Sequence, residues 1–454
     1  MIVLEGGHVA TVDVSGTEYP SGHVAIDGTT IVAVGPGPAP EELRRGAQLL
    51  DTTGCLVTPG LVNTHHHLYQ WLTRGFGADS TLFQWLTELY PIWARIDADA
   101  VHAAASANLG WLALSGCSTS TDHHYVFPKA DPSNAGGDLL EATISAALEI
   151  GVRFQPCRGS MDLGESAGGL PPDSVVEDRE SILIATEAAI DRWHDPSPAA
   201  MTRIAVAPCS PFSVTAELMR EAAELARDKG VRLHTHLAET ADEDEFCLRT
   251  YGQSPAEYLA ELGWLGPDVW LAHCVHLSDS AIKSFAATGT AVAHCPTSNG
   301  RLGAGSARVR ELIDAGVPVG LGVDGSASNE AGRLVDELRS AMVVARLRGG
   351  PQSLTARETL RLATIGGAQC LGRESELGSL EPGKLADVAV WRLDGLGQAG
   401  GADPVFCWAF SSSAPLELLL VNGRGVVADA TLLTADSGRL ARDAAAASAR
   451  LVSR

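Results

Sequence analysis

The segment PGLVNTHHH, residues 59–67, joins a short apolar run to three consecutive histidines. The apolar run predicts a buried strand over Leu61–His65. Because side chains alternate along a strand, His65 and His67 face one side and His66 faces the other. Only His65 and His67 can therefore share a metal ion on the inner face of a sheet.

Similar short β-branched runs alternate with longer stretches of helical period from about Thr58 to Gly350. The helical stretches include Leu139–Ile150, Ala216–Asp228 and Ser278–Ala287. This alternation is typical of an α/β fold in which helices cover a parallel sheet. Eight strand–helix units predict a closed (β/α)8 TIM barrel. The predicted strands are Leu61–His65, Ser118–His123, Val152–Cys157, Arg203–Pro208, Arg232–His236, Val269–His273, Ala291–His294 and Val319–Asp324.

The two ends of the chain show a different pattern, with short strands separated by turn residues. We therefore expect a small β-sandwich domain composed of residues 1–57 and 377–430. This domain flanks the barrel domain of residues 58–376. Residues 431–454 are predicted to form a helical tail, to which the sequence assigns no function.

The composition argues against several classes of partner. With 33 Lys and Arg against 55 Asp and Glu, the formal net charge is −22, which repels nucleic acid phosphates and anionic lipid headgroups. No secretion signal and no run of about 18 apolar residues is found. The nine cysteines form no CxxC pair, which favours reduced thiols. We expect a cytoplasmic protein without nucleic acid or membrane partners.

Chemically capable side chains end several of the predicted strands. Strand five ends in HTHLAE (234–239), strand six in AHC (272–274) and strand eight in GVDG (322–325). Three neutral imidazoles and one carboxylate form the ligand set of a hydrolytic Zn²⁺ or Fe²⁺ site, and Mn²⁺ suits it as well. The candidate ligands are His65, His67, His236 and Asp324.

Two further groups are needed if activated water attacks an sp² carbon, one to move protons and one to hold the attacking oxygen. Glu239 and His273 fit these roles. Strand four, RIAVAPC (203–209), offers no lysine to bridge a second metal, which favours one metal ion. The remaining histidines of this region are expected to pack or to orient the ligands; they are His66, His123, His124, His276 and His294.

These segments resemble the amidohydrolase superfamily, in particular its mononuclear deaminase and chlorohydrolase branch. The resemblance implies one divalent metal, zinc first, held by the four candidate ligands. It also implies that Glu239 shuttles protons, that His273 contacts the nucleophilic water, that Asp324 accepts a proton from that water, and that the chain forms a homo-oligomer. The matching segments are PGLVNTHHH (59–67), HTHLAET (234–240), LAHCVHL (271–277), AHCPTSNGRLGAG (293–305), GVDGSASNE (322–330) and LEPGKLADVAV (380–390).

Gln70 stands three residues after the second histidine of the ligand set. Guanine deaminases carry a glutamine at this offset, and an amide can read the N–H and C=O edge of a lactam. The alternative is that Gln70 caps the following helix. The segments TDHHYVFP (121–128) and 158–182 resemble those of bacterial 8-oxoguanine deaminases, and similar segments occur in s-triazine aminohydrolases.

The resemblance thus implies hydrolytic deamination of a small heterocycle, with 8-oxoguanine converted to uric acid and ammonia as the first candidate. Guanine or isocytosine deamination and removal of an amine from a hydroxyatrazine-type s-triazine are the alternatives. A hypothesis of another class is a noncatalytic binding or scaffold protein on the same barrel. The loop over residues 158–173 either orders over a bound ring or only connects two elements.

Overall fold

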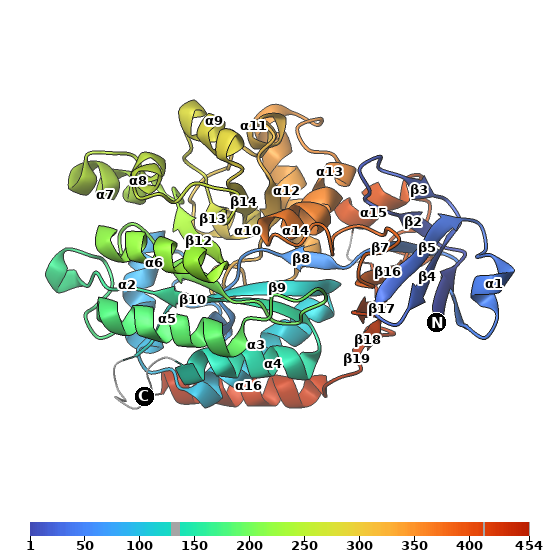
Figure 1. Ribbon diagram of the computed structural model, residues 1–454, viewed down its shortest axis with the longest axis horizontal. Helices are drawn as coiled ribbons and strands as arrows, with labels where there is room; N and C mark the ends of the chain where they lie inside the picture. Colours follow the sequence, from blue (N-terminus) through green and yellow to red (C-terminus); the bar gives the residue numbers. More distant parts are fainter. Residues whose placement is uncertain (129–136, 412–413, 454) are drawn as a thin grey trace.

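Eight parallel strands form one sheet in which neighbours follow in chain order from β8 to β15 (Figure 1). The computed structural model describes residues 1–128, 137–411 and 414–453. Thr64 N donates to Leu321 O at 3.0 Å and Asp324 N donates to His65 O at 3.1 Å, which joins the last strand to the first. The predicted barrel is confirmed. Its strands are β8 Leu61–Asn63, β9 Cys117–His124, β10 Arg153–Ser160, β11 Ala205–Pro208, β12 Arg232–Leu237, β13 Val269–His273, β14 Ala291–His294 and β15 Val319–Leu321.

The first and last barrel strands are shorter than predicted. β8 ends at Asn63 and β15 ends at Leu321, before the histidines and the aspartate that follow them. The backbone at Asp324 has φ +63°, a left-handed conformation, so Asp324 does not continue the extended strand. The candidate ligands on these two segments therefore lie on loops just beyond the strand ends.

Helices connect the strands and cover the outside of the barrel. In α6, the Thr215 side chain accepts a hydrogen bond from Leu218 N, and Gly230 ends the helix at φ +68°. The three predicted helical stretches correspond to α4, α6 and α9. The helices from α2 to α14 are α2 Leu82–Trp93, α3 Ala98–Ala113, α4 Gly137–Ile150, α5 Arg179–Trp193, α6 Ala216–Lys229, α7 Ala241–Tyr251, α8 Pro255–Glu261, α9 Asp279–Thr288, α10 Pro296–Arg301, α11 Val309–Asp314, α12 Leu334–Gly349, α13 Ala356–Arg361 and α14 Gly367–Cys370. Three shorter helical segments are η1 Leu68–Thr73, η2 Glu165–Ala167 and η3 Leu362–Gly366.

Both ends of the chain contribute to two further sheets, which are ordered β5-β4-β1-β6 and β19-β18-β17-β16-β7-β2-β3. β7 pairs antiparallel with β16, so the N-terminal and C-terminal segments share one sheet. Apolar side chains of both sheets, such as Ile26 and Val390, form one buried cluster between them. These elements are β1 Ile2–Glu5, β2 His8–Ala10, β3 Glu18–Tyr19, β4 Gly22–Asp27, β5 Thr30–Pro36, α1 Glu41–Arg44, β6 Gln48–Asp51, β7 Cys55–Pro59, β16 Val388–Arg392, α15 Pro404–Phe410, β17 Leu416–Val421, β18 Arg424–Ala428 and β19 Thr431–Leu432.

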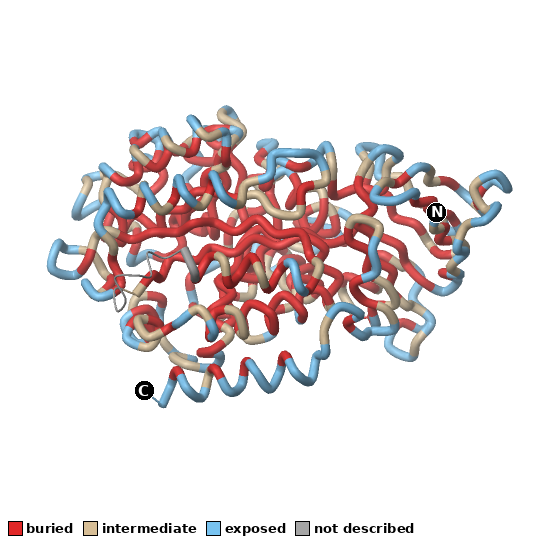
Figure 2. Tube along the Cα trace, turned by 60° about the horizontal axis from the view of Figure 1, so that its bottom comes forward, coloured by how far each residue is buried: buried red, intermediate tan, exposed pale blue. Residues whose placement is uncertain are grey.

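The chain ends in a helix, α16, Ser437–Val452, which packs against α3 and η1. The sheet continues past residue 430, because β19 pairs with β18 before the helix begins. Ser448 Oγ donates to Leu72 O at 2.7 Å, which attaches the tail to the segment that carries Gln70. Figure 2 shows buried residues recurring along one side of this helix, while the barrel strands are buried throughout.

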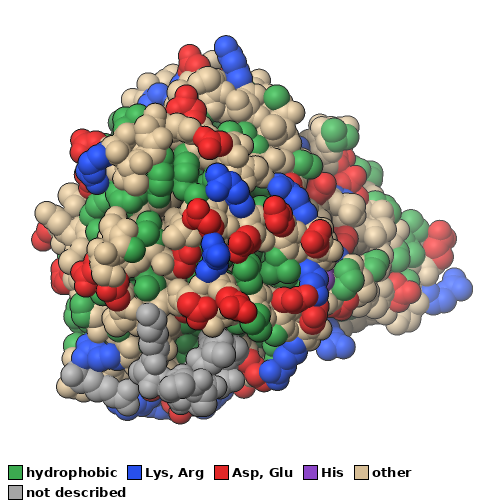
Figure 3. All heavy atoms as spheres, turned by 60° about the vertical axis from the view of Figure 1, so that its left-hand side comes forward, with side chains coloured by type: hydrophobic (Ala, Val, Ile, Leu, Met, Phe, Trp, Pro, Cys, Tyr) green, Lys and Arg blue, Asp and Glu red, His purple; other side chains and the backbone are tan. Residues whose placement is uncertain are grey.

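Charged side chains of both signs are spread over the face shown in Figure 3, where Asp and Glu are interspersed with Lys and Arg. Within the described ranges, the structure contains no helix that is both long and apolar enough to cross a membrane.

Candidate metal centre and active site

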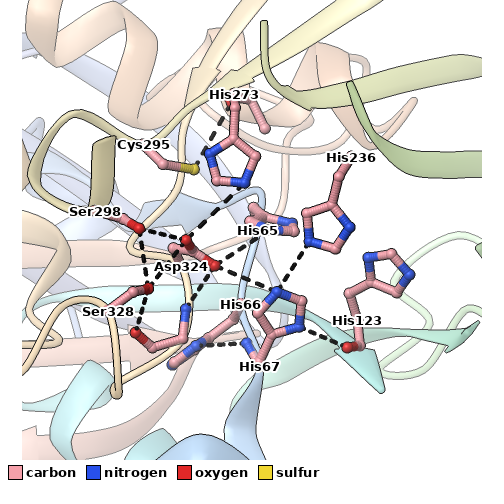
Figure 4. A network of polar contacts seen from close by, with 12 residues as sticks. His65, His66, His67, His123, His236, His273, Cys295, Ser298, Asp324 and Ser328 are labelled. Atoms are coloured by element: carbon pink, nitrogen blue, oxygen red, sulfur yellow. Dashed lines mark hydrogen bonds and ion pairs between the residues drawn. The ribbon is translucent and has the colours of Figure 1, made fainter. Parts of the chain in front are cut away.

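The four predicted metal ligands converge at the carboxyl ends of the barrel strands (Figure 4). Asp324 Oδ1 lies 3.3 Å from His65 Nε2 and 3.3 Å from His67 Nε2. His67 Nε2 lies 3.1 Å from His236 Nε2. His65 and His67 follow β8 and Asp324 follows β15, whereas His236 lies within β12. All four are buried.

The ring protons of these imidazoles are directed away from the centre of the cluster. His67 Nδ1 donates to His123 O at 2.7 Å, and His236 Nδ1 donates to Cys209 O at 2.6 Å. A carbonyl oxygen can only accept, so each ring carries a proton on Nδ1, and the neutral form of each ring has its lone pair on Nε2.

His65 has the same tautomer, for a less direct reason. His234 Nδ1 donates to Trp270 O at 2.8 Å, which leaves the His234 Nε2 lone pair to accept from His65 Nδ1, also at 2.8 Å. His65 Nε2 has no hydrogen-bond partner among the described residues. Three Nε2 lone pairs therefore converge beside one carboxylate.

Burial disfavours the protonated form of two of the three imidazoles. It holds the pKa values of His65 and His236 well below the usual range of imidazole. Burial alone would raise the pKa of Asp324, but the neighbouring His65 and His67 outweigh this effect and lower it. Three neutral imidazoles and one ionised carboxylate are the donor set that Zn²⁺, Fe²⁺ and Mn²⁺ accept. The residues present thus fit one divalent cation.

Two serines fix the second oxygen of Asp324. Ser298 Oγ donates to Oδ2 at 2.6 Å, and Ser328 Oγ donates to the same atom at 3.2 Å. Figure 4 shows both hydroxyls on one side of the carboxylate and the imidazoles on the other. The serines therefore orient Oδ1 towards the imidazoles.

Glu239 and His273 lie next to this cluster. His273 Nε2 is 3.6 Å from Glu239 Oε2 and 4.0 Å from Asp324 Oδ2. His273 Nδ1 donates to Asn299 Oδ1 at 2.9 Å, which leaves the Nε2 lone pair facing the cluster. Burial, together with the negative charge of Asp324, raises the pKa of Glu239 well above its usual range. This shift favours the protonated form of Glu239, the form that can give a proton.

These groups open onto a pocket with about 380 Å³ of empty space. Gln70, in η1, lines this pocket and is only 1% exposed. Neither atom of its amide has a hydrogen-bond partner among the described residues. The alternative role as a helix cap is wrong, because Gln84 and Thr81 form the capping box of α2. The apolar and aromatic part of the pocket wall consists of Leu82, Trp85, Leu86, Tyr90, Tyr125, Phe212 and Leu302.

The predicted loop of residues 158–173 begins later than expected, because β10 continues to Ser160, and the part after the strand packs beside this pocket. Leu170 N donates to Phe212 O at 3.1 Å, and Leu163 N donates to Ser213 O at 3.1 Å. Arg158 forms a two-pronged ion pair with Glu177, at 2.8 and 3.0 Å, on the far side of the loop. The loop is thereby attached to the segment that carries a pocket-lining phenylalanine.

The other histidines lie around the cluster in different ways. His66 points away from it, as alternation predicts, and pairs with Asn108 Oδ1 at 2.9 Å. His123 Nε2 donates to Ala207 O at 2.8 Å. His124 pairs with Val126 O and His276 with Ala304 O. His294 is buried, and neither ring nitrogen has a partner within the described part of the chain.

Sequence reasoning gave no role to several residues that orient the site. Ser298 and Asn299 lie in the segment after strand seven, and Ser328 lies after strand eight. His234 precedes His236 by two residues, so alternation alone already placed it on the inner face. Polar residues just after strand ends were the signal for the other three.

The fold and this cluster define a (β/α)8-barrel protein with a candidate centre for one divalent metal at the carboxyl ends of its strands. The chain belongs to the amidohydrolase family, whose model matches residues 56–426.

Individual relatives match almost the whole chain. It is 43% identical to the 8-oxoguanine deaminase of Pseudomonas aeruginosa over 440 residues, which covers 96% of each chain. It is 38% identical to an isoxanthopterin deaminase from an unknown prokaryotic organism, covering 94% of this chain and 91% of that one. Among solved structures, a mutant of the atrazine chlorohydrolase of Arthrobacter aurescens, complexed with zinc and atraton, superposes with a TM-score of 0.93. That pair is 36% identical over 99% of this chain and 100% of the other.

Proposed function

We propose that this protein is a metal-dependent aminohydrolase that converts 8-oxoguanine and water into uric acid and ammonia. The observation that carries the proposal is the convergence of three imidazole lone pairs and Asp324 beside the acid Glu239, in a pocket lined by an unpartnered amide. The 43% identity to an 8-oxoguanine deaminase supports the choice of substrate.

His65, His67, His236 and Asp324 would hold the metal. A divalent cation bound there, zinc in the first place and Fe²⁺ or Mn²⁺ as alternatives, supplies Lewis acidity that lowers the pKa of water towards about 7. The serines on Asp324, the backbone carbonyls on His67 and His236, and the His234 ring on His65 orient the four donors.

The protein groups then move the protons. Water adds to the ring carbon that bears the exocyclic amine and gives one proton to Asp324, while Glu239 gives its proton to the adjacent ring nitrogen. The C–N bond breaks as the amine takes the proton from Asp324 and leaves as ammonia. The new hydroxyl returns a proton to Glu239, which restores the acid. His273 Nε2 lies close enough to both carboxyl groups to hold the attacking oxygen.

Gln70 would recognise the ring. Its N–H and C=O groups match the C=O and N–H of a lactam edge, and both are free to bind because no described residue engages them. The aromatic wall, which includes Trp85, Tyr90 and Tyr125, suits a planar heterocycle. Water is displaced from the pocket when such a ring enters it.

The alternatives use the same chemistry on another N–C–N carbon. Guanine and isocytosine share the lactam edge, and the likeness to a triazine hydrolase of known structure favours a hydroxyatrazine-type s-triazine as the second candidate. A noncatalytic scaffold would not need a complete donor set with an adjacent buried acid.

The test is release of the exocyclic amine by the zinc-loaded protein from each of five compounds: 8-oxoguanine, guanine, isocytosine and isoxanthopterin, which would release ammonia, and hydroxyatrazine, which would release an alkylamine. We expect the highest kcat/KM with 8-oxoguanine and uric acid as the product, identified by mass. Turnover of triazines alone would remove the purine proposal. A zinc-loaded protein without activity on any of the five would favour the scaffold.

We also propose that the enzyme acts in the cytoplasm as a homo-oligomer. Nine free cysteines, eight of them buried, are compatible with a reducing compartment. Light scattering and cell fractionation test the two parts of this proposal separately.

A further inference from the structure

The chain makes an unusual turn between strand β12 and the acid Glu239. Ala238 has φ +50°, a left-handed conformation that is rare for a residue with a Cβ atom. This turn directs Glu239 into the pocket instead of continuing the strand. A strained conformation of this kind persists only where the surrounding structure holds it.

Glu243 holds this turn from one side. Its Oε1 accepts from Ala238 N at 2.8 Å, and its Oε2 accepts from Glu239 N at 2.9 Å. Glu243 is 0% exposed and lies in the first turn of α7, on the side of the molecule away from the terminal sheets (Figure 1). A glutamate at this position often accepts a hydrogen bond from the N–H group of the residue that caps its own helix. Here the two Glu243 oxygens instead bind the N–H groups of the two residues that precede the cap.

The loop after β13 holds the same turn from the other side. Ala238 O accepts from Val275 N and His276 N, each at 3.0 Å, and Leu237 O accepts from Cys274 N at 3.0 Å. The loop that carries Glu239 is therefore joined to the loop that directly follows His273. The 3.6 Å separation of Glu239 Oε2 and His273 Nε2 depends on this connection.

No described residue offers Glu243 a cationic partner, and its carboxylate is bound only by backbone N–H groups at the start of a helix. Burial raises the pKa of Glu243 to about 7, so keeping a carboxylate here costs free energy of folding near neutral pH. An apolar residue would avoid this cost but could not bind two amides. The carboxylate is needed because this turn presents two backbone N–H groups that both require an acceptor.

We propose that Glu243 is a positioning residue that fixes the carboxyl group of Glu239 for proton transfer by binding the amides of Ala238 and Glu239 with both of its oxygens. The inference rests on the proposed function, because proton transfer by Glu239 is part of it. Glu243 itself lines neither the pocket nor the metal cluster.

The test compares Glu243→Gln with the control Glu245→Gln, which removes an exposed charge from the same helix. A glutamine has one acceptor oxygen, so one of the two amides must lose its partner or face an NH₂ group. Because a misplacement of about 1 Å can cost about 100-fold in rate, we expect kcat on 8-oxoguanine to fall by about 10- to 100-fold. KM and the bound zinc should stay unchanged, and the control should match the wild type.

Glu243→Asp is the second variant, because it keeps the charge and both oxygens but is shorter by one methylene. We expect it to fold and to show a smaller fall in kcat. A crystal structure of either variant should show the Glu239 carboxyl displaced while His65, His67, His236 and Asp324 remain in place. This readout does not need activity, so it separates the inference from the choice of substrate.

Unchanged kcat in Glu243→Gln, or an unmoved Glu239 in its crystal structure, would overturn the proposal. A fall in kcat with an equal loss of zinc would also overturn it, because Glu243 would then support the whole site and not Glu239. If the wild type deaminates no heterocycle, the proposed function fails, and the crystallographic comparison still decides the role of Glu243.

Discussion

The Nε2 atoms of His67 and His236 lie 3.1 Å apart, and each ring donates from Nδ1 to a backbone carbonyl, so the lone pairs of the two neutral rings face each other. Two lone pairs at this distance repel each other unless a cation lies near both. Removal of the metal should therefore destabilise the folded protein as well as stop turnover. Zinc at about 1,000 times its dissociation constant contributes about 4 kcal/mol to the free energy of unfolding. Calorimetry before and after treatment with dipicolinate measures the difference, and equal Tm values would contradict a metal centre here.

Asp324→Asn should lower both zinc affinity and turnover. The substitution removes the only carboxylate within 3.3 Å of His65 and His67 in the described structure. Loss of an outer hydrogen-bond partner alone costs about 10- to 100-fold in metal affinity, so loss of the charged ligand should cost more than about 100-fold. Competition with a chromogenic chelator gives the affinity. Full zinc occupancy in the variant would exclude Asp324 as a ligand.

Glu239→Gln should keep its zinc and lose turnover. Glu239 is not one of the four proposed metal ligands, so its replacement should leave the zinc bound. The amide of glutamine cannot give and take a proton as a carboxyl group does, so turnover should be lost. General acid–base catalysis is typically worth about 100- to 10,000-fold, and kcat should fall by that amount. Metal analysis and steady-state kinetics on the same sample provide the measurement. Wild-type turnover in this variant would remove the proton-shuttle role.

Gln70→Ala and the more nearly isosteric Gln70→Leu should mainly weaken recognition of the substrate. Two hydrogen bonds worth about 0.5–1.5 kcal/mol each correspond to a KM that is higher by about 5- to 150-fold, with a smaller change in kcat. Gln70→Leu should not lower Tm, because the amide it removes has no partner in the described protein. A Tm that falls in Gln70→Leu together with an unchanged KM would indicate a packing role.

Asp387→Ala should destabilise the junction between the barrel and the terminal sheet. Arg153 on β10 pairs with Asp387, beside β16, at 3.1 Å, and both side chains are buried. Removing one partner of a buried ion pair leaves the other charge unpaired and costs about 3–5 kcal/mol. Chemical denaturation gives the value, with Asp443→Ala, from an exposed pair on α16, as the control. Equal stabilities of the two variants would contradict this role.

Much of the fold could be predicted because its signals are local. The β-branched runs at Ala291–His294 and Val269–His273 coincide with β14 and β13, since a buried parallel strand is a short apolar run between turns. The predictions for β8 and β15 extended too far, because Asp324 adopts a left-handed conformation that no residue pattern announces. The candidate site followed from the same logic: strand ends in a barrel meet at one mouth.

The orienting residues could not be predicted to the same extent. Nothing in the spacing distinguishes Glu243 from its acidic neighbours Asp242 and Glu245, yet only Glu243 is buried with both oxygens bound to the backbone. Ser298 and Asn299 differ from other polar loop residues only by what lies beside them in space. Their contacts join segments far apart in the chain, and such contacts leave no periodic trace in a single sequence.

The order of amino acids was enough to specify a barrel and the donor side chains near its strand ends, because burial and alternation act over a few neighbouring residues. The tertiary structure decided which ring nitrogen of the imidazoles carries the proton. Cys209 O and His123 O, each from another strand, take the ring protons of His236 and His67. A lone pair points into the cluster only because an acceptor from elsewhere in the chain binds the opposite side of the ring.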